Sequence, residues 1–411
     1  MIINTKSILV KSKFTRKLCI KEENEDIFDI LNSRNKILHL LKENPRTTKD
    51  LSKDLSLEIR GVRKHLNLLE KIGLITRKTG KLINKKFRYS DTWVLTKDIN
   101  ILTKVPKNHV CMYYKTEHGG KSYKNHFLIL PDTINVSDEL IFSIGFFIAE
   151  GSKTKIKTIE ITNNEPNLIS LFIKTISSFY VDSTDWRWRI AFNKKLKNVF
   201  SSEELNHLEN LSIKFWIYEC NLSKNNFVSF NYSGQENGKL RKNTSIWGTL
   251  ILNYNNFLLT WFLFQLFRFI KKLIFTEKEF IIDYLKGYLS GEAYVGSHNR
   301  EIQFASTCPE DLKFAQICLN QLGIKTSLCK ATVTSPPKVI ITNLKNFLIL
   351  YEFDIFEYHF YKKRELLQKI LNYQIFDQNI KNEVKREFEF INSMILSRKT
   401  NFRKFISKIP A

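Results

Sequence analysis

Two stretches of the sequence decide the fold: SIGFFIAEG at residues 143–151 and LKGYLSGEA at residues 285–293. Each is typical of an apolar helix that ends in an acid between small residues. Small residues also recur four positions apart on each helix: Gly145 with Ala149, and Gly287 with Gly291. Helices without bulky side chains there can cross at less than the usual axis separation of about 8–10 Å. We expect this crossing to bring Glu150 and Glu292 side by side.

The paired carboxylates predict a cation site. Two carboxylates held together repel each other, and a divalent cation balances their charge. Oxygen ligands in a basic protein favour Mg²⁺, and Mg²⁺ beside a phosphodiester indicates hydrolysis. A single helix that ends in a solvated glutamate is common, but here the acid recurs in the second unit of an internal repeat. We therefore interpret Glu150 and Glu292 as metal ligands.

The repeat extends beyond the two helices. EITNN at residues 160–164 corresponds to EIQFAS at residues 301–306, and a helix that begins with proline is expected after each. NYNNFL at residues 253–258 corresponds to NLKNFL at residues 343–348, at an offset of 90. Because the two glutamates are 142 residues apart, the first unit must be longer than the second. The polar segment from about residue 194 to 244 is the predicted insertion.

The two helical stretches resemble the paired motifs of monomeric LAGLIDADG homing endonucleases, and the resemblance covers about residues 130–375. It implies an α+β fold, a pseudo-twofold αββαββα repeat whose two antiparallel sheets form β-saddles over DNA. In that family the acid at the eighth place of each motif binds metal, and Glu150 and Glu292 stand at those places. The resemblance also implies cleavage of both DNA strands that depends on Mg²⁺ and leaves short 3′ overhangs.

The resemblance further implies catalytic residues in the elements that follow the motifs. An amide or hydroxyl that positions the attacking water corresponds by register to Asn163 and Ser306, although a polar residue at a strand end is as often merely solvated. A basic residue near the start of the helix after each NxxNFL segment corresponds to Lys272 and Lys362, with His359 as an alternative. The predicted catalytic set joins these side chains to the two glutamates.

Basic side chains at alternate strand positions are predicted to face DNA, because alternate residues share one face of a strand. Two sets alternate in this way: Lys153, Lys155 and Lys157, and Arg187 and Arg189, which are interleaved with Trp186 and Trp188. We expect the lysines to bind phosphate and the arginines to read bases, since one arginine can donate two hydrogen bonds to guanine. The alternative is an edge whose lysines only prevent aggregation.

The first hundred residues predict a winged helix-turn-helix. Three helices are expected: one capped by Ser33, a short one from Thr47, and a long one between Ser56 and Gly73. The long helix carries an apolar stripe: Val62, Leu66 and Leu69. Two strand-like runs, residues 74–80 and 81–89, then predict a basic hairpin. Residues 30–97 resemble archaeal and bacterial winged-helix regulators.

The long helix is the candidate DNA-reading element. Four polar residues lie off its apolar stripe and are placed to reach a major groove: Arg60, Arg63, Lys64 and Asn67. His65 lies beside the stripe and is interpreted as structural. The alternative is that this charged face is solvated or contacts protein.

The composition indicates a folded protein that binds nucleic acid. There are 65 Lys+Arg and 41 Asp+Glu residues, and the resulting net charge of +24 favours nucleic acid or an anionic membrane surface as partner. Hydrophobic residues make up 43%, with only 14 Gly and 8 Pro, which excludes collagen-like, low-complexity and wholly disordered proteins. The longest apolar stretch, residues 257–267, is shorter than the roughly 20 residues that span a bilayer.

The cysteines and the N-terminus indicate a reducing compartment. The six cysteines form no CxxC pair, and the first residues lack the pattern of a secretory signal. We expect a protein of the cytoplasm or an organellar matrix that associates with DNA and is not secreted. The expected partner is double-stranded DNA, with no membrane, and the expected state is a monomer with internal pseudo-twofold symmetry.

The predicted domains, in chain order, are a winged helix-turn-helix (1–97), a linker (98–132), a first LAGLIDADG subdomain (133–273), a second (274–393), and a basic tail (394–411) that adds phosphate contacts. Two other functions stay open. One is a transcriptional regulator that keeps a decayed LAGLIDADG core, and the other is a maturase that binds intron RNA with the same saddle. The two retained acids weigh against the regulator.

Overall fold

The computed structural model divides the chain into two compact units. The N-terminal unit contains Asn4–Lys6 and Lys11–Ile134, and the C-terminal unit contains Met1–Ile3, Ser7–Val10 and Asn135–Ala411. The structure describes residues 2–10, 18–26, 28–78, 82–83, 87–88, 91–96, 103–114, 117–118, 121–122, 126–151, 158–179, 181, 186–233, 246–296, 300–332, 335–374 and 377–407.

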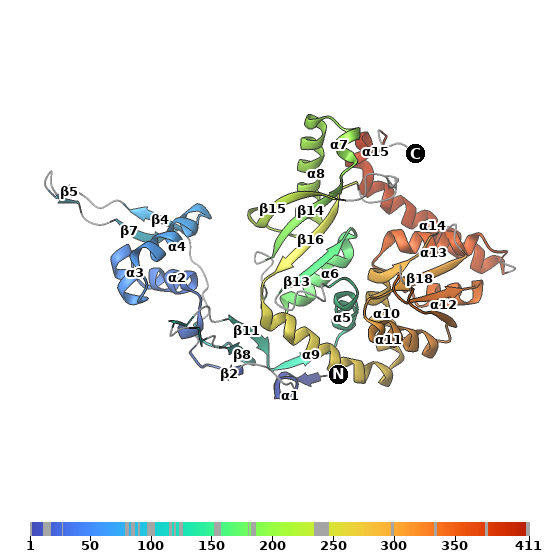
Figure 1. The fold of residues 1–411 in the computed structure, drawn as a ribbon, viewed down its shortest axis with the longest axis horizontal. Coiled ribbons are helices and arrows are strands. Elements are labelled where there is room, and N and C mark those ends of the chain that lie inside the picture. Colours follow the sequence, from blue (N-terminus) through green and yellow to red (C-terminus); the bar gives the residue numbers. More distant parts are fainter. Residues whose placement is uncertain are drawn as a thin grey trace. The chain divides into compact units, whose positions relative to one another are not determined.

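In the N-terminal unit, three helices pack around one apolar core (Figure 1): α2 (Ser33–Glu43), α3 (Thr48–Asp54) and α4 (Ile59–Lys71). The core includes the predicted stripe of α4: Val62, Leu66 and Leu69. Thr47 and Asp50 form a capping box, which satisfies free N–H groups at the start of α3. These elements confirm the helix-turn-helix that the sequence predicts.

The start of α2 differs from the prediction, whereas the start of α4 agrees with it. The cap of α2 is Asn32, whose side chain accepts two backbone hydrogen bonds of the first turn, so Ser33 lies inside the helix. Helix α4 begins at Ile59, after Ser56 has adopted a left-handed φ of 51° in the turn. Asparagine and serine cap helices equally well, so the sequence does not choose between two such neighbours.

The wing is longer than the sequence predicts. Strand β4 (Ile75–Lys78) pairs antiparallel with β7 (Thr92–Leu95) rather than with the run that directly follows it. Two short strands between them, β5 (Leu82–Ile83) and β6 (Phe87–Arg88), pair with each other. Trp93 explains why β4 pairs with β7. This residue of β7 is buried in the helical core, and its burial places β7 beside β4.

The predicted linker, residues 98–132, contains two strands of a sheet. Strands β8 (His109–Tyr114) and β11 (His126–Pro131) pair antiparallel, and β2 (Leu18–Lys21) completes the order β11-β8-β2. Three consecutive side chains are buried in each long strand: Val110, Cys111 and Met112 in β8, and Leu128, Ile129 and Leu130 in β11. The linker prediction is therefore wrong, because these residues belong to the body of the N-terminal unit.

The C-terminal unit is built on two apolar helices that pack against each other (Figure 1): α5 (Asp138–Glu150) and α10 (Lys278–Glu292). The strand order is β13-β16-β14-β15 in the first sheet and β17-β18-β20-β19 in the second. The strands are β13 (Ile159–Asn163), β14 (Arg187–Asn193), β15 (Phe227–Ser233), β16 (Thr249–Tyr254), β17 (Ala293–Tyr294), β18 (Glu301–Ala305), β19 (Thr326–Cys329) and β20 (Lys338–Thr342). The covering helices are α6 (Pro166–Ser177), α9 (Phe257–Leu273), α11 (Pro309–Gln321) and α12 (Leu344–Glu352).

Strand pairing confirms the internal repeat. The residue after each glutamate pairs antiparallel with the following strand, Gly151 with Ile161 and Ala293 with Phe304. By this register β13 corresponds to β18 and β16 to β20. Helices α6 and α11 occupy the same place in the two halves, and each has proline in its first turn. The α+β repeat predicted from the sequence is therefore the fold of this unit.

The first half contains extra elements where the sequence predicts an insertion. They are α7 (Leu196–Val199), α8 (Ser202–Cys220) and β15, and β15 pairs in parallel with β14 at the edge of the first sheet. Ser201 and Glu204 form a capping box that starts α8. The described residues of the second half contain no element that corresponds to α8.

Helix α9 belongs to the core of the first half. Asn256 caps it, and the side chains of Leu258, Leu259 and Phe262 are buried. Its apolar character is therefore explained by packing. Within the described residues, no helix is both long enough and apolar enough to cross a membrane.

The C-terminal segment returns to the first half. Helices α13 (Phe360–Leu371) and α14 (Gln378–Lys399) pack against each other. Beyond them, the ring of Phe402 lies against the rings of Phe215 and Trp247. The prediction of a basic tail at residues 394–411 is therefore wrong for its described part, because residues 394–407 are integrated into the fold.

Candidate active site at the helix crossing

Helices α5 and α10 cross with their backbones in contact. A Cβ atom on Gly145 would overlap the carbonyl oxygen of Tyr284, and a Cβ atom on Gly287 would overlap that of Phe142. The crossing therefore requires glycine at both positions, because a backbone oxygen cannot move aside as a flexible side chain can. The small residues singled out in the sequence are the ones that meet.

The crossing places Glu150 and Glu292 at the same end of the two helices, each as the final residue. Both residues are half-buried. The side chain of Glu150 lies against α10, because a Cβ on Gly291 would stand 2.9 Å from its Cγ and 3.5 Å from its Oε1. Since a helix C-terminus carries partial negative charge, two carboxylates and two helix ends form one negative centre.

Lys362, the third residue of α13, supplies the positive charge at this centre. Its Nζ donates to three carbonyl oxygens at the end of α10, those of Leu289 at 3.3 Å, Ser290 at 2.6 Å and Gly291 at 2.8 Å. Burial lowers the pKa of Lys362 to about 8, while the nearby charges of the two glutamates act in the opposite direction. One ammonium therefore lies within electrostatic reach of both carboxylates.

Lys272, the other predicted basic residue, lies elsewhere. It is exposed in the last turn of α9. The second half continues into α13 after α12, whereas the first half continues from α9 into α10, so the position of Lys362 has no equivalent in the first half. His359, the alternative to Lys362, caps α13 with its ring.

Asn163 and Ser306 occupy equivalent places behind the two carboxylates. Asn163 Nδ2 donates to Glu150 Oε1 at 2.9 Å. Ser306 Oγ accepts from the N–H of Cys308 at 3.2 Å. Both residues are buried. In the first half, the amide therefore reaches the carboxylate.

A buried ion pair behind the site was not predicted from the sequence. The carboxylate of Glu165, at the N-cap of α6, has 0% of its surface exposed and receives Arg398 Nη1 at 2.6 Å. Burial raises the pKa of Glu165 to about 7, against the opposing charge of Arg398. The sequence offers only a weak signal, an acid directly before the proline that opens a helix.

This pair predicts a stability that depends on pH. The pKa of Glu165 is about 7 in the folded protein and 4.5 in the unfolded chain. The stability that this group contributes is therefore fully present below pH 4.5 and is lost as the pH rises through 7. In the wild type, we expect this group to lower the free energy of unfolding by about 3 kcal/mol between these pH values. In Glu165→Gln this decrease should be absent. Chemical denaturation at each pH measures it. Glu203→Gln, an exposed control, should keep the wild-type slope, and the same slope in both variants would contradict the assignment.

The chemistry of the two glutamates suits a divalent cation such as Mg²⁺. Mg²⁺ is commonly bound by one or two carboxylates together with phosphate oxygens and water, rather than by a closed protein cage. Among the described residues no group of three or more His, Cys, Asp and Glu could hold a metal. Two half-buried carboxylates at converging helix ends supply the oxygen donors, and they leave the remaining positions to other ligands.

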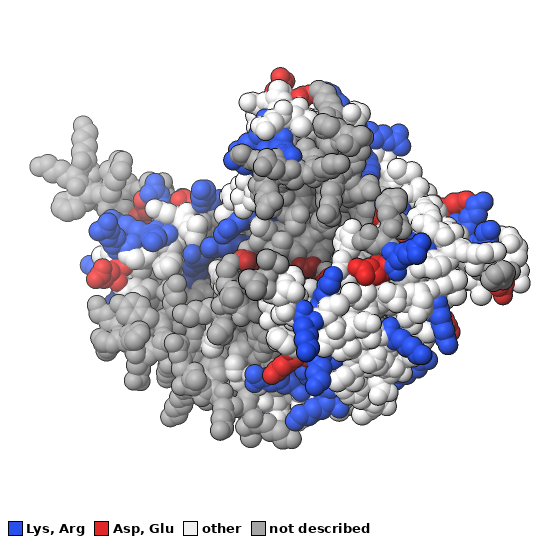
Figure 2. Space-filling view, turned by 45° about the vertical axis from the view of Figure 1, so that its right-hand side comes forward, with Lys and Arg blue, Asp and Glu red and all other residues white. Residues whose placement is uncertain are grey.

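The arginines of β14 lie on the outward face of the first sheet. Arg187 and Arg189 are exposed, whereas Trp186 and Trp188 are fully buried. Lys153, Lys155 and Lys157 lie outside the described residues. Lys and Arg side chains are more prominent than Asp and Glu on the face in view (Figure 2). The strand therefore presents guanidinium groups to solvent and tryptophans to the core, as the alternation predicts.

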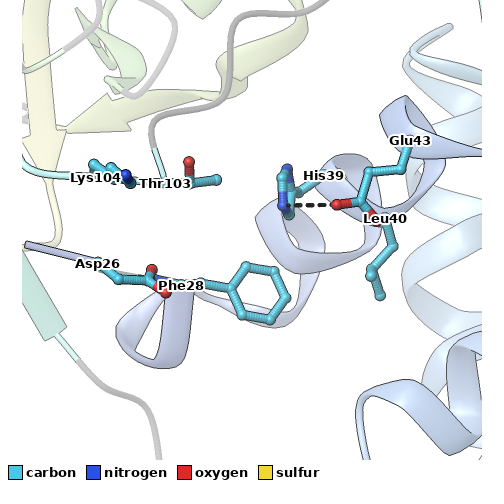
Figure 3. Close-up of a pocket in the computed structure, with 7 residues that line it drawn as sticks. All are labelled: Asp26, Phe28, His39, Leu40, Glu43, Thr103 and Lys104. Atoms are coloured by element: carbon cyan, nitrogen blue, oxygen red, sulfur yellow. Dashed lines mark hydrogen bonds and ion pairs between the residues drawn. The ribbon is translucent and has the colours of Figure 1, made fainter.

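The helix-turn-helix presents a second polar face. Four residues of α4 are exposed: Arg60, Arg63, Lys64 and Asn67. His65 is half-buried, and burial with the charges of Arg34 and Lys64 lowers its pKa, which fits a structural role. In the same unit a shallow pocket lies between α2 and residues near Lys104, with the contact between His39 Nε2 and Glu43 Oε1 on its wall (Figure 3).

Two family models match parts of the chain. Residues 32–77 match the bacterial regulatory proteins of the arsR family, and residues 279–353 match the LAGLIDADG-like domain. A comparison with curated proteins finds no match. The first match covers α2, α3 and α4, and the second runs from α10 to the end of α12.

Solved structures of similar fold include two kinds of protein. The homing endonuclease I-DmoI, in complex with DNA and Mn, is 13% identical, and the match covers 54% of this chain and 98% of that one with a TM-score of 0.33. Full-length DUF199/WhiA from Thermatoga maritima is 10% identical, with 64% and 69% covered and a TM-score of 0.32. The sheet topology and the family models together identify the chain as a LAGLIDADG-like fold with an N-terminal helix-turn-helix.

Proposed function

We propose that the protein is a site-specific endonuclease that hydrolyses both strands of DNA with Mg²⁺ and leaves short 3′ overhangs. One observation carries the proposal: Glu150 and Glu292, far apart in sequence, end two crossing helices beside one shared ammonium, that of Lys362. A DNA-binding scaffold does not need two acids at such a point, because they would repel the DNA phosphates.

The residues of the site have separable tasks. Glu150 and Glu292 would hold Mg²⁺, which supplies polarisation of the phosphate and a more acidic bound water. Asn163 fixes the direction of the Glu150 carboxylate through its hydrogen bond. Burial raises the pKa of Glu150, and the charge of Lys362 acts against this shift, so Lys362 favours the ionised carboxylate. The same ammonium would offset negative charge that develops on a phosphate.

Binding of a long DNA site is assigned to the basic surfaces. The net charge of +24 attracts the phosphate backbone and makes the affinity fall with added salt. Arg187 and Arg189 are the side chains proposed to read bases, and the exposed face of α4 would contact a further segment of DNA. Lys272 carries a lesser role in this proposal, because it is exposed in the last turn of α9. Ser306 stands at the position that corresponds to Asn163.

Cleavage of a duplex library with randomised sites tests the function. The purified chain is incubated with the library and Mg²⁺, and a reaction with EDTA serves as control. Recovery of one cut sequence with 3′ overhangs is the expected result. Selective binding without cutting would favour a regulator, and binding to intron RNA in place of duplex DNA would favour a maturase.

A DNA-binding regulator is the second candidate function. The match of residues 32–77 to the arsR family of regulatory proteins favours it, because that helix-turn-helix is complete and its polar face is exposed. Addition of Mg²⁺ separates the two functions. It should start DNA cleavage by an endonuclease, whereas a regulator should bind the same sequence, without cutting it, whether or not the cation is added.

Arg189 gives a test of sequence reading. It is exposed on β14 between Ile251 of β16 and Ser229 of β15. For Arg189→Ala we expect the loss of about 1–3 kcal/mol of discrimination at one base pair, measured by competition among single-base variants of the selected site. Arg386→Ala, on the exposed face of α14, should leave the discrimination unchanged. Equal weakening on every sequence would instead make Arg189 a phosphate contact.

A further inference from the structure

A buried guanidinium connects the C-terminal helix to the first half of the site. Arg398 of α14 donates to Glu165 Oε1 at 2.6 Å and to Asn167 Oδ1 at 2.6 Å, and its Nη2 lies 3.5 Å from Glu219 Oε2. Its guanidinium also lies 4.8 Å from the centroid of the Phe360 ring, at the first residue of α13. One side chain therefore contacts the starts of both α6 and α13.

The first of two paths from this cluster leads to Glu150. The backbone N–H of Glu165 donates to Asn163 Oδ1 at 2.8 Å, and Asn163 Nδ2 donates to Glu150 Oε1 at 2.9 Å. The position of Glu165 thus fixes the carboxamide of Asn163, and the carboxamide orients the carboxylate. A shift of the α6 start would move this hydrogen bond directly.

The second path leads to the end of α10. Arg398 reaches the start of α13 directly, because its guanidinium lies against the ring of Phe360. At that start, Nδ1 of His359 accepts the backbone N–H of Lys362 at 3.4 Å, and Oε2 of Glu165, 3.9 Å from this Nδ1, is beyond hydrogen-bond range. His359 is buried, and burial lowers its pKa well below the usual value, so it packs here as a neutral ring. Lys362 then reaches the last carbonyls of α10, beside Glu292.

We propose that Arg398 is a positioning residue of the active site, which holds Glu165 and the start of α13 and thereby sets the geometry of Asn163 and Lys362 around the carboxylate pair. This inference rests on the proposed function. We do not propose that Arg398 contacts DNA, because its guanidinium is paired with the carboxylate of Glu165 inside the protein. Side chains that orient metal ligands from behind commonly change metal affinity or activity by about 10- to 100-fold when they are replaced.

Three single variants test the proposal at pH 8, where Glu165 is ionised. Arg398→Met should slow single-turnover cleavage by about 100-fold and weaken Mn²⁺ binding by about 10-fold, with DNA affinity unchanged. Arg398→Lys should recover most of both losses, because it keeps the charge beside Glu165. Arg386→Met, on the exposed face of the same helix, should match the wild type. Wild-type cleavage and Mn²⁺ affinity in a folded Arg398→Met would overturn the proposal.

A double variant covers the case in which Arg398→Met does not fold. Glu165→Gln with Arg398→Met removes both charges from the interior, so that neither is left unpaired. We expect this protein to fold, as its thermal transition will show, and to keep the losses of rate and Mn²⁺ affinity. A folded double variant with wild-type values of both would also overturn the proposal.

A spectroscopic readout separates this inference from the proposed function. ¹³C NMR of the lysine ε-carbons, with Lys362→Arg for assignment, should show Lys362 titrating near pH 8 in the wild type. In Arg398→Met, or in the double variant, its pKa should move toward the ordinary value as α13 loosens. If the wild type neither binds Mn²⁺ nor cuts DNA, the proposed function fails, but this shift still supports the positioning role, and an unchanged pKa still contradicts it.

Discussion

Glu150→Gln should abolish DNA cleavage and leave DNA affinity largely intact. The substitution removes one of the two charges that would hold Mg²⁺ and keeps the shape of a side chain that packs against Gly291. Metal coordination contributes several kcal/mol of charge stabilisation to such a reaction, so we expect a loss of about 10³-fold or more in the single-turnover rate. Gel-based cleavage and fluorescence anisotropy on the same duplex measure the two quantities.

Two further variants serve as comparisons for Glu150→Gln. Glu292→Gln should show a loss of similar size, since each carboxylate ends one of the crossing helices. Glu279→Gln, exposed in the first turn of α10, controls for removing a negative charge from the same helix and should cut normally. Undiminished cleavage by Glu150→Gln would remove the basis of the proposed mechanism.

Gly287→Ala should destabilise the C-terminal unit more than an ordinary core substitution. The added Cβ would overlap the carbonyl oxygen of Phe142 and stand 2.8 Å from the N of Phe146, so the two helices must separate. Overpacking costs about 1–3 kcal/mol in typical cores and more where backbone is the neighbour, so we expect about 3 kcal/mol or more. Thermal melting should show this as a decrease of roughly 10 °C in the Tm.

Gly61→Ala is the control with the opposite sign. Gly61 lies inside α4, and a Cβ there would have no atom within 4 Å. Alanine is more favourable than glycine inside a helix by up to about 1 kcal/mol, so this variant should be slightly more stable. Equal effects of the two substitutions would show that helix propensity, rather than contact between the backbones, governs Gly287.

The crossing could be predicted from the sequence because its cause is local. Residues four apart face the same side of a helix, so Gly145 with Ala149 and Gly287 with Gly291 mark a surface where two backbones can meet. The glutamates then follow from their place at the helix ends. The same reasoning predicted that Arg187 and Arg189 would alternate with buried tryptophans, since a strand has a period of two.

The polar surroundings of the site depend on contacts that no local pattern reveals. Lys272 and Lys362 were equally good candidates, and only the path of the chain after α12 brings Lys362 to the end of α10. Arg398 and Glu165 are 233 residues apart, and their pairing exists because α14 returns to the first half. The strands β8 and β11 were missed for another reason, since their buried runs lack the alternation that marks a half-exposed strand.

The unequal halves of the C-terminal unit have a consequence for the way DNA is approached. A protein with two identical halves could sit on a near-palindromic duplex in either of two orientations with the same energy. Helix α8 and strand β15 are present on one side only, so the two orientations differ in energy here. A difference of about 1.4 kcal/mol already makes one orientation tenfold preferred. Under the proposed function, the duplex would then be read with a direction.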